Sequence, residues 1–165
     1  SLYGQIAGED ESGYLPSKTF YSIGMSFSWD RLYLKKINFE YIDTGSRQIN
    51  TTYNHSIYKN GYRYYGMPIG SAFDADSKVS IFNYYQALGR NNNISFKLIK
   101  ASLNYNKNEN YFINDLSDDL DIFEIKFAQR FLKRTYFNLT FQYSNFMKVD
   151  TYDNLSAHTV IEYRW

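Results

Sequence analysis

The chain has 165 residues, a length that suits one domain rather than two. Its 18 Lys and Arg residues against 17 Asp and Glu leave a formal net charge of +1, so no excess of positive charge is present to attract nucleic acid. The absence of Cys excludes disulfides and Cys-ligated metal centres, and an aromatic content of 20% is too high for a disordered chain.

The first clear pattern in the chain runs from Thr19 to Trp29. Aromatic and apolar residues at the odd positions alternate with mostly small and polar residues at the even ones. A period of two predicts a strand with one apolar face. Strands of soluble proteins average about 5 to 6 residues, whereas about 9 to 11 residues are needed to cross a bilayer at a tilt. The length of this segment therefore indicates a membrane-spanning strand.

Six further segments repeat the same alternation, and with Thr19 to Trp29 and the N-terminal segment that begins at Ser1 they predict about eight strands. They are a strand from near Tyr33 through Tyr41, a weaker one over Val79 to Leu88, and strands over Ile94 to Tyr105, Phe123 to Phe131, Thr135 to Ser144 and Ala157 to Trp165. The apolar positions change face after Leu98, which we interpret as a β-bulge near that residue. The terminal aromatic Trp165 resembles the C-terminal signature of bacterial outer-membrane barrels. Since Ser1 starts in mid-strand without an initiator Met or leader, we expect a processed or truncated chain.

The lengths of the connections support an all-β, antiparallel transmembrane β-barrel over residues 1–165. Outer-membrane barrels have short periplasmic turns and longer external loops. Short connections are expected at Asp30 to Leu32, Leu88 to Asn93 and Lys133 to Arg134, and longer ones at Gly8 to Ser17, Thr44 to Lys78, Asn106 to Asp118 and Phe146 to Leu155. Charges on the polar faces are expected to pair across strands in a solvated lumen without a catalytic role; they are Glu40, Glu124, Lys126, Arg130, Glu162 and Arg164.

Two residue clusters on the external side are candidates for binding glycan. The first is the acidic run Glu9, Asp10 and Glu11. The second lies in the longest loop and comprises Tyr53, Asn54, His55, Tyr58, Tyr62, Arg63, Asp74 and Asp76. Tyrosine rings offer flat surfaces to the C–H faces of sugars, and the polar groups supply hydrogen bonds. The structural alternative is that the Tyr residues join an aromatic girdle and Arg63 pairs with a loop carboxylate.

Several separate segments resemble one known family. YGQIAGEDE, FEYIDT, TYNHSIY, NGYRYYGMPIG and DADS are similar to the C-terminal portion of the capsule assembly family typified by Wzi. The resemblance implies a bacterial outer-membrane β-barrel that acts as a surface lectin, in contact with membrane lipid. It also implies that missing strands complete a larger barrel of about 18 strands. Its partner would be capsular polysaccharide or exopolysaccharide, which it attaches or assembles at the cell surface without chemistry and without a cofactor.

Three other functions are compatible with parts of the sequence. His55 with Asp74 or Asp76 and a Ser could form an acid–base site of a hydrolase at the external rim, although no G-x-S-x-G elbow is present. The Ser residues considered are Ser56, Ser71 and Ser77. The acidic run with Asp74 and Asp76 could hold Ca²⁺, although EF-hand spacing is missing. A passive porin is the third alternative. Glycan binding accounts for more of the loop composition than any of these.

Overall fold

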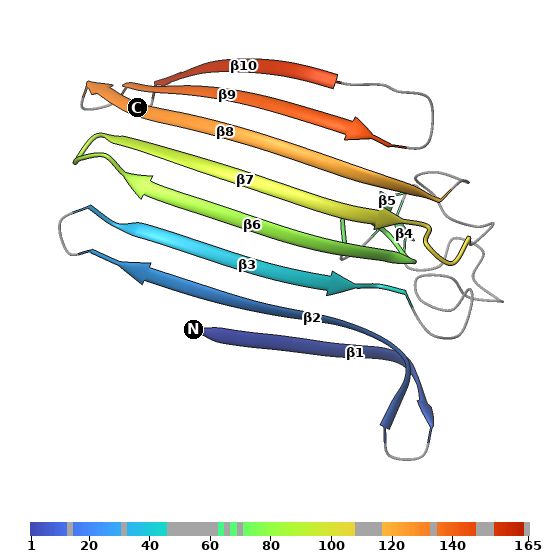
Figure 1. Cartoon of the computed structure of the whole chain (residues 1–165). Helices are drawn as coiled ribbons and strands as arrows, with labels where there is room; N and C mark the ends of the chain where they lie inside the picture. Colours follow the sequence, from blue (N-terminus) through green and yellow to red (C-terminus); the bar gives the residue numbers. More distant parts are fainter. Residues whose placement is uncertain are drawn as a thin grey trace.

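The fold is a single large antiparallel sheet with the order β1-β2-β3-β6-β7-β8-β9-β10 (Figure 1). The structure is a computed structural model that describes residues 1–12, 15–30, 33–45, 63–64, 67–68, 71–107, 117–132, 135–147 and 154–163. The strands of the sheet are β1 (Leu2–Ser12), β2 (Leu15–Trp29), β3 (Lys35–Asp43), β6 (Ser77–Ala87), β7 (Asn92–Leu103), β8 (Asp118–Leu132), β9 (Thr135–Phe146) and β10 (Asn154–Tyr163). The prediction of an all-β antiparallel fold with about eight strands is confirmed.

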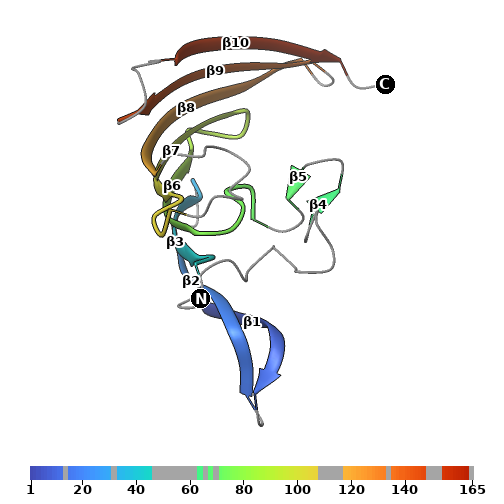
Figure 2. The ribbon, with the colours of Figure 1, turned by 90° about the vertical axis from the view of Figure 1, so that its right-hand side faces the viewer.

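The sheet is strongly curved, and one small hairpin lies on its concave side. Figure 2 shows the sheet bending through an arc from β1 to β10, with β4 (Arg63–Tyr64) and β5 (Met67–Pro68) inside the arc. Among the described residues, β1 pairs only with β2 and β10 only with β9, so the sheet is open. We call the concave side the inner face and the convex side the outer face. No α-helix in the described part of the chain has the length and hydropathy to cross a bilayer.

Connections of two kinds alternate along the sheet. Residues 30–34, 88–91 and 133–134 connect strands at one end, on the left in Figure 1, and residues 44–76, 104–117 and 147–153 do so at the other. We call these the short-turn end and the loop end. The predicted alternation is confirmed for these connections.

The expected first loop, Gly8 to Ser17, is wrong. The ladder between β1 and β2 continues through Asp10↔Ser17 to Ser12↔Leu15, so only residues 13–14 connect the two strands. An antiparallel pair keeps its backbone groups satisfied as it extends, and acidic residues are compatible with a strand outside lipid. The end of this hairpin bends away from the other strands in Figure 1.

The outer face carries a continuous apolar band. Cross-strand register places the outward residues in rows, and the two central rows contain only apolar and aromatic side chains. These rows are Met25, Phe39, Phe82, Leu98, Phe123 and Tyr143, and Phe27, Ile37, Tyr84, Phe96, Ile125 and Phe141. Phe27 is 66% exposed and Met25 is 54% exposed. On β3 the band is bounded by Lys35 and Asp43, so polarity returns toward both ends of the strand.

The expected β-bulge near Leu98 is wrong, because β7 pairs with β6 and β8 without interruption past this residue. The apolar residues change face while the strand does not. Ile99, Ala101 and Leu103 lie on the inner face at the loop end, where they belong to a buried cluster with Val79 and Leu120. A second apolar environment inside the curve therefore explains the change of pattern. The described ladder between β8 and β9 does contain a register shift, between Arg130 and Leu132.

The outer band gives a test of the membrane orientation of each face. Phe123→Arg places a charge in the central outward row and is expected to destabilise the folded protein by about 2–4 kcal/mol in a bilayer. Gln142→Arg is the matched control, because Gln142 pairs with Glu124 on the inner face of the same two strands and should tolerate a cation. Urea unfolding of the full-length protein in lipid vesicles measures both. Equal destabilisation by the two substitutions would contradict the assignment of faces.

Candidate functional site

The two ends of the connection between β3 and β6 meet in a buried junction. The Thr44 N–H donates to the Ser77 carbonyl at 2.9 Å, and the Ser77 N–H donates to Thr44 Oγ1 at 3.1 Å. Thr44 Oγ1 in turn donates to the Asp74 carbonyl at 2.7 Å. Thr44 and Ser77 are both fully buried. Buried hydrogen bonds of this kind are costly to break, so the stem of the longest loop is fixed to the sheet.

The segment Ser71–Asp76, which we call the strap, folds back over the inner face at the loop end. Phe73 packs against the cluster that contains Val79 and Leu103, and the Ser77 hydroxyl donates to the Phe73 carbonyl at 2.6 Å. Asp74 and Asp76 have φ values of 60° and 52°. Asp adopts this left-handed conformation more readily than most residues, which lets the strap turn tightly. The strap therefore covers the apolar part of the inner face.

Asp76 links the strap to the neighbouring loop between β7 and β8. Its carboxylate accepts hydrogen bonds from the Asn106 backbone N–H at 2.9 Å and from Asn106 Nδ2 at 2.6 Å. The Tyr105 N–H donates to the Asp76 carbonyl at 3.3 Å. Two loops that are far apart in the sequence are thus tied together beside the sheet.

A second contact between the same loops is centred on Tyr105. Its hydroxyl donates to Asp43 Oδ1 at 3.1 Å, and the Gly45 N–H donates to the same oxygen at 2.9 Å. A Cβ at Gly45 would collide with the Tyr105 ring, so a larger residue here would displace the ring from Asp43. The Lys78 ammonium lies 4.1 Å from the centre of the ring, within the range of a cation–π interaction. Burial, followed by the charge of Asp43, raises the pKa of the Tyr105 hydroxyl.

Comparison with known proteins identifies the family of this architecture. The family model for the capsule assembly protein Wzi matches residues 1–160. The chain belongs to the Wzi capsule assembly family. A solved structure matches with a TM-score of 0.84 and 27% identity, over 98% of this chain and 37% of the solved chain. That protein is Wzi of Escherichia coli, an outer membrane protein involved in group 1 capsule assembly and described as a carbohydrate-binding β-barrel.

This member of the family therefore spans 37% of the length of the solved Wzi chain that it matches. A search among curated proteins found no match. The resemblance noted in the sequence is confirmed by the family match, and the barrel fold is confirmed by the structural match. That missing strands complete a barrel of about 18 strands stays a prediction.

The structure separates the predicted site residues into two groups. Asp74 and Asp76 are 0% and 5% exposed, and their place in the strap gives them a structural role. Glycan contact by these two residues stays a prediction that their burial does not support. For Glu9, Asp10 and Glu11 the structure describes only the backbone, within β1, and the same holds for Arg63 in β4. The remaining candidates lie outside the described residues; they are Tyr53, Asn54, His55, Tyr58 and Tyr62.

The described residues do not support the calcium site or the hydrolytic site that were considered as alternatives. Within the described ranges, no group of three or more His and acidic residues is arranged to hold a metal ion, so the calcium hypothesis stays a prediction. Ser77, one of the Ser residues considered for a hydrolytic site, is buried and its hydroxyl bonds to loop carbonyls. Its role in the described structure is to hold the strap.

Sequence reasoning missed Thr44, Tyr105 and Asn106, which connect the loops. The segment DADS was recognised as unusual but interpreted as a surface for ligands. Its position directly before a strand was the available signal, because polar residues there often satisfy the backbone of a turn.

The tie between the loops can be tested with Asp76→Ala. Removal of the carboxylate leaves both Asn106 donors without this acceptor, and we expect the free energy of unfolding to fall by about 1–3 kcal/mol. Cleavage of the loop by a protease should be faster. Asn106→Ala combined with Asp76→Ala should cost less than the sum of the single substitutions, since the two side chains share one interaction. The control is Asp121→Ala, because the Asp121 carboxylate lies 3.9 Å from the ammonium group of Lys100, whose side chain is exposed. If the effects of the Asp76 and Asn106 substitutions on the free energy of unfolding are additive, the tie is contradicted.

The raised pKa of Tyr105 gives a test at alkaline pH. The folded state favours the protonated hydroxyl, so its contribution to stability is complete below the ordinary tyrosine pKa of about 10 and is lost as pH rises through the higher folded value. Tyr105→Phe lacks this titration. The difference in unfolding free energy between the wild type and Tyr105→Phe should be constant from about pH 7 to 9 and shrink above about pH 10. A difference in unfolding free energy that does not change with pH would contradict the raised pKa of Tyr105.

Proposed function

We propose that this protein is a bacterial outer-membrane β-barrel protein that binds capsular polysaccharide or exopolysaccharide at the cell surface and helps to attach or assemble it. The observation that carries the proposal is the curved eight-stranded sheet with an apolar outer face, which matches the barrel of a carbohydrate-binding outer membrane protein. Membership of the Wzi family supports the same function.

The outer face suits contact with membrane lipid. Large apolar side chains are exposed along every strand of the central rows, including Phe82, Leu98 and Phe123. In water such a surface would be expected to aggregate, whereas in a bilayer it is solvated by acyl chains. Strands joined by backbone hydrogen bonds satisfy the polar groups of the backbone at the same time.

The loop end suits contact with glycan outside the cell. Outer-membrane barrels place short turns in the periplasm and longer loops outside, so residues 44–76 lie on the extracellular side. The strap anchors this loop, and β4 and β5 lie on the concave side of the sheet (Figure 2). This loop carries the Tyr, Asn, His and Arg candidates, and we propose that they bind extended glycan outside the cell.

Binding without catalysis agrees best with the residues of the site. The carboxylate of Asp76 already accepts two hydrogen bonds, and Asp74 is fully buried. A general acid or base must reach a substrate proton directly or through one water, and neither side chain is exposed for this. Glycan adhesion needs only a stable surface of rings and hydrogen-bonding groups.

The experiment replaces Tyr53, His55 and Arg63 together by Ala in the full-length protein. Loss of aromatic and Arg anchors typically costs more than about 1 kcal/mol each, so glycan affinity should fall by about tenfold or more. Polysaccharide retained at the cell surface and binding by the purified protein are measured, with heat-modifiable migration as the test of folding. The matched control is Tyr33→Ala with Arg90→Ala, which removes the same kinds of residue at the short-turn end.

Undiminished retention by a folded triple variant would remove this loop from the binding site. If the wild-type protein binds no polysaccharide, the proposed function itself is wrong.

A further inference from the structure

The inner face has a purely polar zone between the strap and the short-turn end. Two adjacent cross-strand rows contain no aliphatic residue, and we call them the polar belt. The rows are Ser26, Asn38, Asn83, Lys97, Glu124, Gln142 and Ser156, and Ser28, Lys36, Tyr85, Ser95, Lys126, Thr140 and His158. The next row toward the loop end is mixed, with Gly24, Glu40 and Ser144 beside Ile81, Ile99 and Ile122. On β6, β7 and β8 the inner face therefore changes from apolar to polar at this row.

The polar belt carries an excess of positive charge. With His neutral, its three ammonium groups, on Lys36, Lys97 and Lys126, face one carboxylate, on Glu124, so the net charge is +2. The next row adds the carboxylate of Glu40 on β3, so the positive excess is carried by Lys97 and Lys126 on β7 and β8 rather than by the whole inner face. A concave surface with a positive excess attracts anions.

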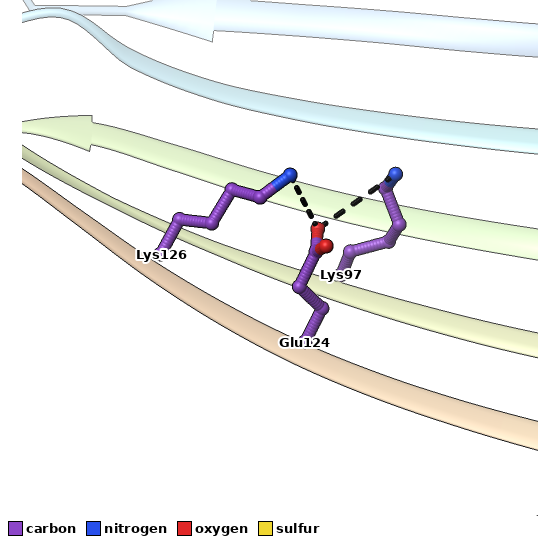
Figure 3. Close-up of polar contacts among 3 residues, drawn as sticks. All are labelled: Lys97, Glu124 and Lys126. Atoms are coloured by element: carbon purple, nitrogen blue, oxygen red, sulfur yellow. Dashed lines mark ion pairs between the residues drawn. The ribbon is translucent and has the colours of Figure 1, made fainter. Parts of the chain in front are cut away.

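The centre of the belt is a group of three charged residues on two neighbouring strands (Figure 3). Glu124 Oε1 lies 3.1 Å from the Lys126 ammonium and 3.8 Å from the Lys97 ammonium. The Glu124 side chain is 13% exposed, whereas those of Lys97 and Lys126 are 40% and 47% exposed. One covered carboxylate thus holds two accessible ammonium groups close together. Each ammonium has three donors, so both retain the capacity to bind a second anion.

The surroundings of these lysines carry neutral hydrogen-bonding groups. Gln142 is paired with Glu124 and Thr140 with Lys126 across the ladder to β9, while Asn83 is paired with Lys97 across the ladder to β6. Amides and hydroxyls of this kind match the hydroxyl groups of a sugar. A small inorganic anion would need only the two ammonium groups, whereas an acidic sugar would use both sets.

We propose that the polar belt is a binding site for an acidic polysaccharide, with the carboxylate of a uronic acid residue placed between Lys97 and Lys126. The sugar hydroxyls then bind Gln142, Thr140 and Asn83. This inference rests on the proposed polysaccharide binding and extends it, because it names the chemical class of glycan and a second contact surface inside the curve. Glu124 sets the spacing of the lysines and also competes with the incoming carboxylate.

Because Glu124 competes with the ligand for the two ammonium groups, substitution of Glu124 and substitution of the lysines should change the affinity in opposite directions. The full-length protein in detergent is titrated with trigalacturonic acid and with the same trisaccharide after reduction of its carboxyl groups. Lys97→Gln with Lys126→Gln should weaken binding of the acid by about tenfold or more, since two charge-assisted contacts are lost. Glu124→Gln should strengthen it by about threefold or more, since a carboxylate that repels the ligand is removed. Neither change should alter binding of the reduced trisaccharide by a comparable factor.

Matched controls separate the site from general charge and folding effects. Lys100→Gln removes the same charge from the same strand, β7, but on the outer face, and should leave affinity for the acid unchanged. Lys97→Arg with Lys126→Arg retains the charges and should restore most of the binding. Lys126→Cys adds a thiol at the belt that a water-soluble maleimide can label, with the unsubstituted full-length protein as the reference for background labelling, and protection by trigalacturonic acid is expected.

Each result has a defined meaning. Unchanged affinity of the folded Lys97→Gln, Lys126→Gln protein overturns the inference, as does weaker binding after Glu124→Gln. Failure of the maleimide to reach Lys126→Cys means that another protein segment covers the belt, and also overturns it. If the wild type retains cell-surface polysaccharide but does not bind trigalacturonic acid, only this inference fails. If it binds neither, the proposed function fails as well.

Discussion

The architecture depends on the backbone hydrogen bonds that join neighbouring strands. In hydrocarbon no water can satisfy a free N–H or C=O group, so strands that cross a membrane must pair on both sides. From β2 to β9 every strand of the sheet has two neighbours, and the antiparallel ladders fix which side chains share a face. On β2 this pairing is enough to place alternate residues on opposite faces. The outer face receives Ile23, Met25 and Phe27, and the inner face receives Ser22, Gly24 and Ser26. The pairing therefore determines which residues form the outer face. The residues of the inner face are not limited to apolar types, and they can pack against the strap or form a polar surface.

The inner face divides into an apolar zone, which the strap covers, and a polar zone. At the loop end its apolar residues are covered by the strap, so that Phe73 and the external loop belong to the same folding unit as the sheet. Toward the short-turn end the polar belt has no aliphatic residue and a positive excess. In this arrangement the packed zone stabilises the mouth of the barrel, and the polar zone beside it is suited to hydrated ligands. The sheet that carries both zones is the part of the chain that matches the solved carbohydrate-binding barrel.

The sequence predicted the strands well because lipid imposes a simple rule on every outward residue. It predicted the inner face poorly, because Ile99, Ala101 and Leu103 are apolar in order to pack under a strap that is distant in sequence. In the sequence, a shift of the apolar residues from one face to the other has the same pattern as a β-bulge. The acidic residues at 9–11 were interpreted as a loop because acidic residues are unfavourable in strands on average, whereas the ladder to β2 continues through them. For the site, the sequence identified the loop and the family, but it could not show that Asp76 binds Asn106, because that contact depends on the meeting of two loops in space.

The junction of Thr44 with Ser77 has a consequence for how this family can diversify. Hydrogen bonds between Thr44 and Ser77 join the two ends of the connection at the wall, and the strap beside them packs on the inner face. Changes of sequence or length in the rest of the connection are therefore expected to leave the wall intact, because loops accept such changes at a low entropic cost. If the loop binds glycan as proposed, its sequence can change together with the polysaccharide at the cell surface while the wall that carries it is retained.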